Sequence, residues 1–188
     1  MNLRFKLVKI CWVIVAAFWA ISALSVKPTK ERQPLPGRLL YLLLTVFAVL
    51  LINGTVGGIQ LNRFVFAQTP GLGIVANVMV VLGLFLSIWA RAVLGTNWSA
   101  RVTLKENHEL IQRGPYRVVR HPIYSGLLLM ILGTVLVIGR LSGFLAFCVS
   151  ICGLWFKLRQ EEALMAKHFP ETYPQYKSTT KALIPFIL

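Results

Sequence analysis

The fold is decided by the stretch GPYRVVRHPIYSGLLLMILGTVLVIG, residues 114–139. Its first part carries Arg117, Arg120 and His121 beside two prolines, and the part after His121 contains no charged residue. Proline is tolerated in the first turn of a helix, so Pro122 predicts the start of a long apolar helix. Polar groups at a membrane edge are energetically costly, which indicates that they have a function.

The rest of the chain is also strongly apolar. Of its 188 residues, 56% are hydrophobic and 14% are charged, whereas soluble proteins carry about a quarter charged residues. A helix needs roughly 20 apolar residues to cross the hydrocarbon layer, so we expect an all-α, polytopic membrane protein forming a single domain. Five transmembrane helices are predicted at about residues 7–26, 39–60, 72–94, 122–139 and 141–158, with a connector at 95–121 and a tail at 159–188.

The basic residues predict the orientation of these helices. A net charge of +14 would suggest nucleic-acid binding in a soluble protein, but here it follows the positive-inside rule. With the N-terminus outside and the C-terminus in the cytoplasm, fifteen of the 20 Lys and Arg residues lie on the cytoplasmic side. We therefore expect membrane lipids as partners, and no nucleic acid. The residues left outside are Arg4, Lys6, Lys9, Arg63 and Arg140.

Cysteine and histidine spacing gives no indication of a metal site. Cys11, Cys148 and Cys152 fall inside apolar runs, which predicts small, buried hydrophobic side chains. The three histidines are scattered along the chain and lack paired ligand spacing. The sequence also contains no Walker A loop, G-x-G-x-x-G or G-x-S-x-G pattern. We expect no metal, and no nucleotide site of those kinds.

Acidic residues are scarce and occur mainly in two places, both on the predicted cytoplasmic side. Glu106 and Glu109 lie in the connector, and Glu161 and Glu162 lie in the tail. The helix start at Pro122 offers unpaired N–H groups that favour an anion. The sequence thus predicts a cytoplasmic pocket built from these segments. Interfacial anchoring of the Arg and Tyr residues, or ordinary surface ion pairs, remain alternatives.

The tail predicts helix as far as about His168, a break near Pro170, and a second short helix on the membrane surface. Helical spacing allows Lys157 to pair with Glu161, four residues later. Lys157 and Arg159 point in different directions on such a helix, so at most one of them faces a shared pocket.

Short motifs in the C-terminal half carry a family resemblance. They are Trp98-Ser99, His108-Glu109-Leu110-Ile111, Gly114-Pro115-Tyr116-Arg117, Arg120-His121-Pro122-Ile123-Tyr124-Ser125-Gly126, Glu161-Glu162, His168-Phe169, Tyr173-Pro174-Gln175-Tyr176 and Ile184-Pro185. Jointly they resemble the isoprenylcysteine carboxyl methyltransferase and phospholipid methyltransferase family of integral membrane enzymes.

The resemblance implies methyl transfer from S-adenosyl-L-methionine to a lipidic acceptor that enters from the bilayer, in particular the carboxylate of an isoprenylcysteine-like molecule. In the family, an arginine one turn before the glutamate orients the substrate carboxylate. This chain has Lys157 there, and its nearest arginine is Arg159, so both are catalytic candidates. The implied cofactor-binding residues are His108, Glu109, Leu110, Ile111, Gly114, Tyr116, His121, Pro122, Ile123, Tyr124, Glu161 and Glu162.

Other function classes stay open on the sequence. Sterol and steroid reductases that use NADPH share an Arg-His-x-Asn-Tyr-x-Gly element, but Ile123 replaces the Asn here and Leu127 replaces a following acidic residue. A phospholipid amine N-methyltransferase and a non-enzymatic membrane scaffold are further alternatives. The expected location is the cytoplasmic membrane of a prokaryote or the endoplasmic reticulum of a eukaryote, and the sequence leaves the oligomeric state open.

Overall fold

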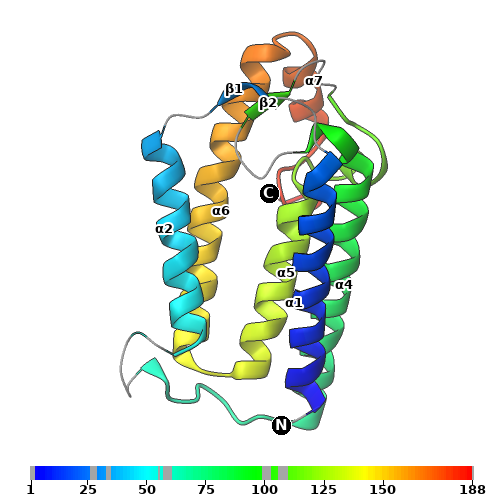
Figure 1. The fold of residues 1–188 in the computed structure, drawn as a ribbon. Helices are drawn as coiled ribbons and strands as arrows, with labels where there is room; N and C mark the ends of the chain where they lie inside the picture. The colour runs from blue at the N-terminus through cyan, green and yellow to red at the C-terminus, as the bar shows by residue number, and fades with distance from the viewer. Residues whose placement is uncertain are drawn as a thin grey trace.

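Five long helices run side by side along an elongated bundle (Figure 1). The computed structural model describes residues 3–25, 29–32, 35–54, 56, 61–98, 103–105 and 110–187. All five predicted apolar segments form helices, so the helical prediction is confirmed in its main elements. These helices are α1 (Leu3–Ser22), α2 (Leu35–Ile52), α4 (Pro70–Leu94), α5 (Pro122–Ile138) and α6 (Leu141–His168).

The two ends of the bundle differ. At one end, here called the hairpin end, α1 begins and α5 turns directly into α6 (Figure 1). The opposite end, here called the site end, carries helix α7 (Thr172–Thr179) and two short antiparallel strands, β1 (Thr29–Arg32) and β2 (Thr103–Lys105). Short 3-10 turns precede or follow the helices at this end: η1 (Ala23–Ser25), η2 (Gly95–Asn97) and η3 (Gly114–Arg117).

Local signals in the sequence explain where the helices begin and end. The Thr69 side chain accepts a hydrogen bond from the Leu72 N–H at 3.2 Å and caps α4. Pro122 occupies the first turn of α5, as predicted. Gly139 ends that helix with a φ of 67°, a left-handed conformation that favours glycine. The short turn that follows makes α5 and α6 an antiparallel hairpin.

Helices α4 and α5 pack against each other through small residues. A Cβ atom added to Gly133 would lie 2.5 Å from the Ala76 carbonyl oxygen, and one added to Gly83 would lie 2.5 Å from the Gly126 carbonyl oxygen. Both distances are shorter than a carbon atom tolerates, so only glycine permits this approach. The pair therefore forms a rigid support for the start of α5 at the site end.

The outer surface of the bundle is apolar. Leu43 of α2 and Phe85 of α4 are 66% and 67% exposed, and many other large hydrophobic side chains on α1, α2 and α4 are exposed as well. Such a surface is characteristic of contact with lipid rather than water. Three helical stretches are long and apolar enough to cross a membrane: Arg4–Ser22, Pro70–Asn97 and Leu141–His168. The apolar parts of α2 and α5 are shorter, so the five-span topology and its orientation stay predictions.

Three details of the structure differ from the sequence prediction. Helix α2 ends at Ile52 and not near residue 60, because the chain turns at Asn53 and at Gly54, whose φ is 70°. The two short strands add to the helices, so the fold is mostly rather than entirely α. Of the cysteines only Cys11 is buried; Cys148 and Cys152 are exposed on the apolar outer surface of α6, which apolar sequence alone does not distinguish from a buried face.

Candidate functional site

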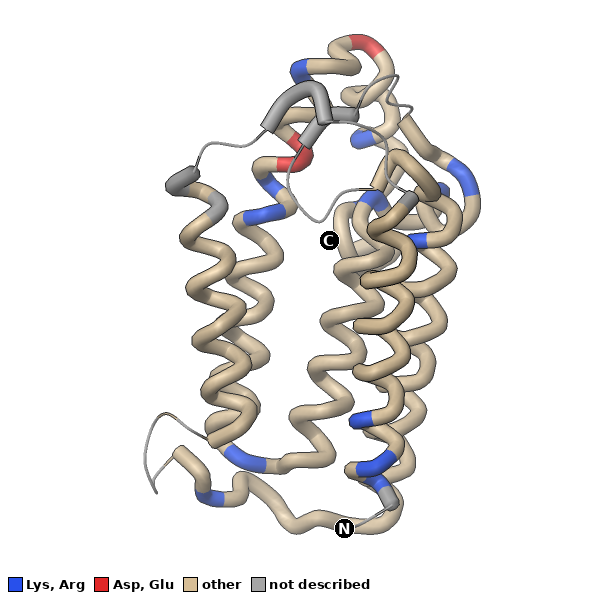
Figure 2. The backbone as a smooth tube through the Cα atoms, viewed as in Figure 1, with Lys and Arg blue, Asp and Glu red and all other residues tan. Residues whose placement is uncertain are grey.

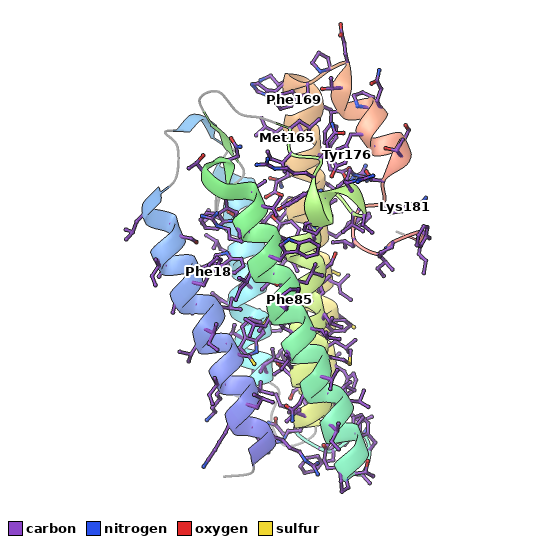
Figure 3. The ribbon with its side chains drawn as sticks, turned by 90° about the vertical axis from the view of Figure 1, so that its right-hand side faces the viewer. Phe18, Phe85, Met165, Phe169, Tyr176 and Lys181 are labelled. Atoms are coloured by element: carbon purple, nitrogen blue, oxygen red, sulfur yellow. The ribbon has the colours of Figure 1, made fainter. Side chains whose placement is uncertain are left out.

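Four segments that are distant in sequence meet at the site end: residues 110–121, the first turn of α5, the last turns of α6, and the tail with α7. The tail breaks after His168 and continues as α7, as predicted. Figure 3 shows Tyr176 and Lys181 of the tail at the same end of the bundle as Met165 and Phe169. Basic positions occur at both ends of the bundle, whereas the acidic positions drawn in Figure 2 lie at the site end.

The tail is tied to the start of α5 by backbone hydrogen bonds. The Arg120 and His121 N–H groups donate to the carbonyl oxygens of Lys181 and Ala182 at 2.8 and 3.0 Å. The Ser125 hydroxyl donates to the Leu183 carbonyl oxygen at 2.5 Å. These bonds hold His121 in place at the N-cap position of α5, where its side chain does not cap the helix. The imidazole is therefore available for other contacts.

His121, Tyr124 and Glu161 form the centre of the site. The rings of His121 and Tyr124 are stacked, with centroids 5.5 Å apart and planes within 1° of parallel. The Tyr124 hydroxyl donates to Glu161 Oε1 at 2.6 Å, and His121 Nδ1 lies 3.6 Å from Glu161 Oε2. His121 and Tyr124, three residues apart, therefore lie on the same side of the start of α5. The Glu161 side chain keeps 23% of its surface exposed, so its carboxylate remains accessible to a ligand.

Glu162, by contrast, is buried in an ion-pair cluster. Its Oε1 accepts a hydrogen bond from Arg120 Nε at 2.7 Å, and its Oε2 lies 3.0 Å from Lys177 Nζ. Arg120 also donates from its guanidinium to the Thr180 carbonyl oxygen. Arg120 therefore links the segment before α5 to α6 and the tail. Because its side chain is only 8% exposed, the anchoring alternative is wrong for this residue. The two adjacent glutamates have different environments: Glu162 holds the site together and Glu161 faces its open side.

Two buried tyrosines lock the connector against the tail. The Tyr176 hydroxyl of α7 donates to the Tyr116 carbonyl oxygen in η3 at 2.6 Å. Burial, joined by the nearby Glu162 carboxylate and opposed by Arg120, raises the pKa of Tyr176 to about 12. Burial also raises the pKa of Tyr116 well above its usual range. Both phenols are thus neutral at physiological pH and serve as packing and hydrogen-bonding groups.

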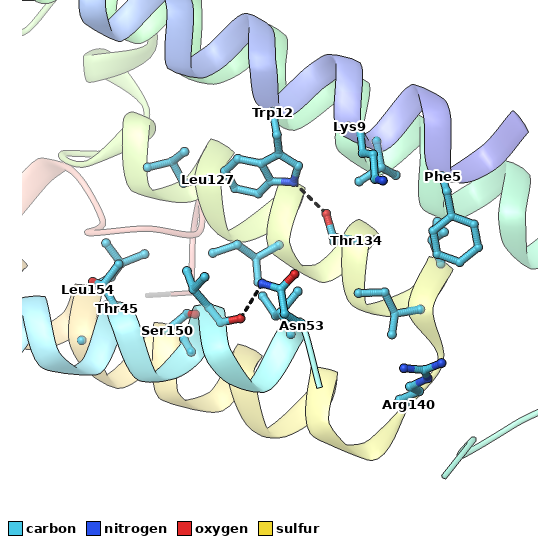
Figure 4. Close-up of a pocket in the computed structure, with 18 of the residues that line it drawn as sticks. Phe5, Lys9, Trp12, Thr45, Asn53, Leu127, Thr134, Arg140, Ser150 and Leu154 are labelled. Atoms are coloured by element: carbon cyan, nitrogen blue, oxygen red, sulfur yellow. Dashed lines mark hydrogen bonds between the residues drawn. The ribbon is translucent and has the colours of Figure 1, made fainter. Parts of the chain in front are cut away.

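An apolar cavity of about 790 Å³ leads away from this centre into the bundle (Figure 4). Side chains of α1, α2, α5 and α6 line it, among them Trp12, Leu127 and Leu154. Lys157 lines its end nearest the site, where its Nζ lies 5.4 Å from the ring centroids of both Tyr41 and Tyr124. Because Tyr124 also bonds Glu161, Lys157 stands where the cavity meets the His121 and Glu161 centre.

The structure brings together most of the predicted site residues that it describes. Tyr116, Pro122 and Ile123 are buried around the centre, and Ile111 packs against the same core cluster. Gly114 opens η3 with a φ of 59°, in the left-handed region. Arg159 is exposed, and the structure does not bring it to the cavity. His108 and Glu109 lie outside the described residues.

Two contributors to the site were missed in the sequence. Lys177 pairs with Glu162 from α7, and Tyr41 lies beside Lys157 from α2. A tail that returns to the start of α5 could have suggested a basic partner for Glu162. No local sequence pattern distinguishes Tyr41, because its position beside Lys157 results from the packing of α2 against α6.

Comparison with known proteins identifies relatives of this arrangement. The family model described as phospholipid methyltransferase matches residues 72–172, slightly more than half of the chain. That range runs from α4 to the beginning of α7 and includes all the described centre residues.

Individual proteins are similar over a comparable range. A protein-S-isoprenylcysteine O-methyltransferase of Schizosaccharomyces pombe is 32% identical over 132 residues, which is 68% of this chain and 54% of that protein. A probable protein-S-isoprenylcysteine O-methyltransferase of Oryza sativa subsp. indica is 28% identical over 131 residues, covering 68% of this chain and 66% of that protein. The cobalt-zinc-cadmium resistance protein CzcN of Cupriavidus metallidurans is 34% identical over 101 residues, covering 50% of this chain and 44% of that protein. The chain thus spans less than two thirds of the length of each of these relatives.

Proposed function

Because the chain belongs to the phospholipid methyltransferase family, we propose that it transfers a methyl group from S-adenosylmethionine to the carboxylate of a lipidic, isoprenylcysteine-like acceptor. The observation that carries this proposal is the position of Lys157. It joins an apolar cavity, suited to a hydrocarbon tail, to a polar centre of His121, Tyr124 and Glu161. The names of the similar S. pombe and rice proteins support the same acceptor class.

The residues at the centre fit the methyl donor. His121 Nε2 is buried and has no hydrogen-bond partner within the usual limits, its nearest carboxylate oxygen being Glu162 Oε1 at 3.5 Å. The accessible Glu161 carboxylate suits the ammonium group or ribose hydroxyls of S-adenosylmethionine. The predicted anion site at the start of α5 is largely filled, because the His121, Tyr124 and Ser125 N–H groups already donate to backbone carbonyl oxygens. His108, Glu109, Leu110 and Ile111 are proposed to complete this binding site.

The acceptor is proposed to lie in the cavity with its carboxylate near Lys157. Helices α1 and α2 both line the cavity and carry exposed apolar side chains, so a lipid is proposed to reach it from the bilayer between them. An ammonium group attracts a carboxylate strongly where water is scarce. The same cation disfavours a phospholipid amine as acceptor, since two positive groups would meet at the reaction centre.

Methyl transfer to a carboxylate requires that the acceptor oxygen be aligned with the methyl carbon, and it does not require a protein acid or base. When bound, S-adenosylmethionine supplies a methyl group on a positively charged sulfur. A carboxylate acceptor has no proton to lose, so Lys157 needs only to orient one carboxylate oxygen toward that methyl carbon. The methyl ester formed is uncharged and no longer attracts Lys157, which favours its release. Tyr124 holds Glu161 by its hydrogen bond and so preserves this geometry.

Methyl transfer from labelled S-adenosylmethionine to a farnesylcysteine analogue tests the proposal. We expect Lys157→Gln to raise KM for the analogue about tenfold or more, because a charge-assisted contact contributes about 1.5–3 kcal/mol. Arg159→Gln removes an equivalent charge two residues away, from an exposed position, and is expected to change KM little. The reverse result would assign the orienting role to Arg159.

Other outcomes of this assay and of cofactor-binding measurements would contradict the proposed acceptor or the proposed methyltransferase activity. Transfer to phosphatidylethanolamine in a lipid extract, with none to the farnesylcysteine analogue, would replace the carboxylate by an amine acceptor. Micromolar affinity for NADPH with none for S-adenosylhomocysteine would support a reductase. If the protein is a membrane scaffold, the native chain will bind no cofactor, and His121→Ala and Glu161→Ala will not alter cofactor binding.

The proposed orientation places the site end in the cytoplasm and the N-terminus outside, with α2 and α5 completing five spans. The short apolar parts of α2 and α5 lie alongside longer helices, which supports their crossing the same layer (Figure 1). The proposed membrane is the cytoplasmic membrane in a prokaryote or the endoplasmic reticulum in a eukaryote.

The orientation is tested with Arg63→Cys and Lys181→Cys, each labelled with a membrane-impermeant thiol reagent. Reagent on the outer side should reach only the first, and labelling of only the second would show the inverted arrangement.

A further inference from the structure

The cavity has a second cationic end that methyl transfer does not use. Lys9 and Arg140 line it at the hairpin end (Figure 4). Lys157 lines the end nearest the site, beside Tyr124. We infer that this end binds the phosphate of an anionic glycerophospholipid, whose acyl chain lies in the adjoining part of the cavity.

The charges at this end favour an anionic lipid over a zwitterionic one. Lys9 comes from α1, and Arg140 occupies the N-cap position of α6, where the helix dipole adds further positive potential. The Arg140 guanidinium lies 5.7 Å from the ring centroid of Phe64, another residue that lines the cavity, and this contact holds it at the rim. Acidic positions are drawn only at the site end of the described chain (Figure 2). A lipid phosphate would supply negative charge here.

The wall between the two ends suits hydrocarbon. The hydroxyls of Thr45, Thr134 and Ser150 donate to the carbonyl oxygen four residues earlier on their own helices, at 2.7, 2.8 and 2.8 Å. The Trp12 indole N–H donates to the Thr134 hydroxyl oxygen at 3.0 Å. Because these polar groups already form hydrogen bonds within the protein, covering them with an acyl chain leaves none of them unsatisfied and carries little desolvation cost.

Helix α5 gives an approximate distance between the two cationic ends of the cavity. From Tyr124, beside Lys157, to Arg140 the chain rises about 24 Å at the helical rate of 1.5 Å per residue. The hydrocarbon layer is about 30 Å thick, so each half of the cavity corresponds roughly to one leaflet. The acceptor enters the half at the site end, and the anionic lipid occupies the half at the hairpin end. The volume of about 790 Å³ lies within the range of ligand sites.

Lipid binding to the purified full chain tests this inference without any methyl transfer. The protein in neutral detergent is titrated with dioleoyl phosphatidylglycerol or dioleoyl phosphatidylcholine, and bound lipid is counted by native mass spectrometry alongside the thermal unfolding midpoint. Phosphatidylglycerol is expected to bind one to one and to raise the midpoint more than phosphatidylcholine. Lys9→Gln and Arg140→Gln should each weaken phosphatidylglycerol binding about fivefold.

Arg63→Gln is the matched control, because Arg63 is an exposed cation at the same end that does not line the cavity. It should leave phosphatidylglycerol binding unchanged. The inference is overturned if phosphatidylcholine binds equally well, if Arg63→Gln weakens binding as much as Lys9→Gln, or if inorganic phosphate alone reproduces the shift. Should Arg140→Gln fail to fold because it alters the start of α6, the comparison of Lys9→Gln with Arg63→Gln decides.

Discussion

Glu161 and Glu162 are neighbours in sequence with different surroundings, and substitution by glutamine tests the separate roles proposed for them. Glu161→Gln keeps the shape of an accessible side chain and removes the charge proposed to meet the methyl donor. We expect it to weaken S-adenosylhomocysteine binding at least tenfold while leaving the unfolding temperature nearly unchanged. Isothermal titration calorimetry and thermal unfolding in detergent measure the two effects.

Glu162→Gln is expected to act on stability instead. It leaves the Arg120 guanidinium, whose side chain is 8% exposed, without its carboxylate. Removing one partner of a buried ion pair costs on the order of 3 kcal/mol. Equal effects of the two substitutions on cofactor binding and on stability would contradict this division of roles.

Tyr176 contributes a buried hydrogen bond, and the burial of its phenol makes the stability of the protein depend on pH. Tyr176→Phe leaves the Tyr116 carbonyl oxygen without this donor and should destabilise the protein by about 1 kcal/mol at neutral pH. The folded-state pKa of about 12 is higher than the unfolded value of about 10. The stabilising contribution is therefore complete below pH 10 and is lost as the pH rises from 10 toward 12.

Alkaline unfolding of the two proteins checks this sign. The native protein should lose more stability between pH 10 and pH 12 than Tyr176→Phe, because the variant has no phenol at that position to ionise. Parallel losses in both proteins would show that Tyr176 does not titrate with unfolding.

Helix packing is most sensitive where α4 meets α5. Gly133→Ala places a methyl group 2.5 Å from the Ala76 carbonyl oxygen and must push the helices apart. We expect a loss of about 1–3 kcal/mol, as for other overpacked cores. Gly71→Ala, also in α4, meets nothing within 4 Å and is expected to be neutral or slightly stabilising. Thermal unfolding of both variants compares them, and similar midpoints would mean that the close approach is not needed.

Helix starts and breaks were the elements best predicted from the sequence. Pro122 and Pro170 restrict the backbone locally, so the beginning of α5 and the break after α6 could be placed without knowing the fold. The end of α2 could not, since the apolar run continues past Ile52 and the turn at Gly54 depends on Asn62 packing beside it. Hydrophobicity therefore shows how long an apolar segment is, but it does not show where the helix within that segment ends.

Across the whole molecule, contacts within one helix face were predictable and contacts between distant segments were not. His121, at the N-cap position, and Tyr124, in the first turn of α5, are three residues apart, so the contact between them is local. The pairing of Arg120 with Glu162 joins residues 42 positions apart and depends on how the tail folds back. Which residues form the site stays a prediction from the resemblance, whereas the structure itself separates Lys157, at the cavity, from the exposed Arg159.

The contrast between the α4 and α5 contact and the cavity has a mechanical consequence. One side of the bundle is joined by backbone contacts that cannot be compressed, whereas α1 and α2 face each other across a volume of about 790 Å³. A change in the lateral pressure or thickness of the surrounding bilayer would therefore deform mainly the side of the bundle that contains the cavity. Lys157 of α6 and Tyr124 of α5 come from different helices at the site end of that volume, so the bilayer's elastic state would act on the spacing between these two residues.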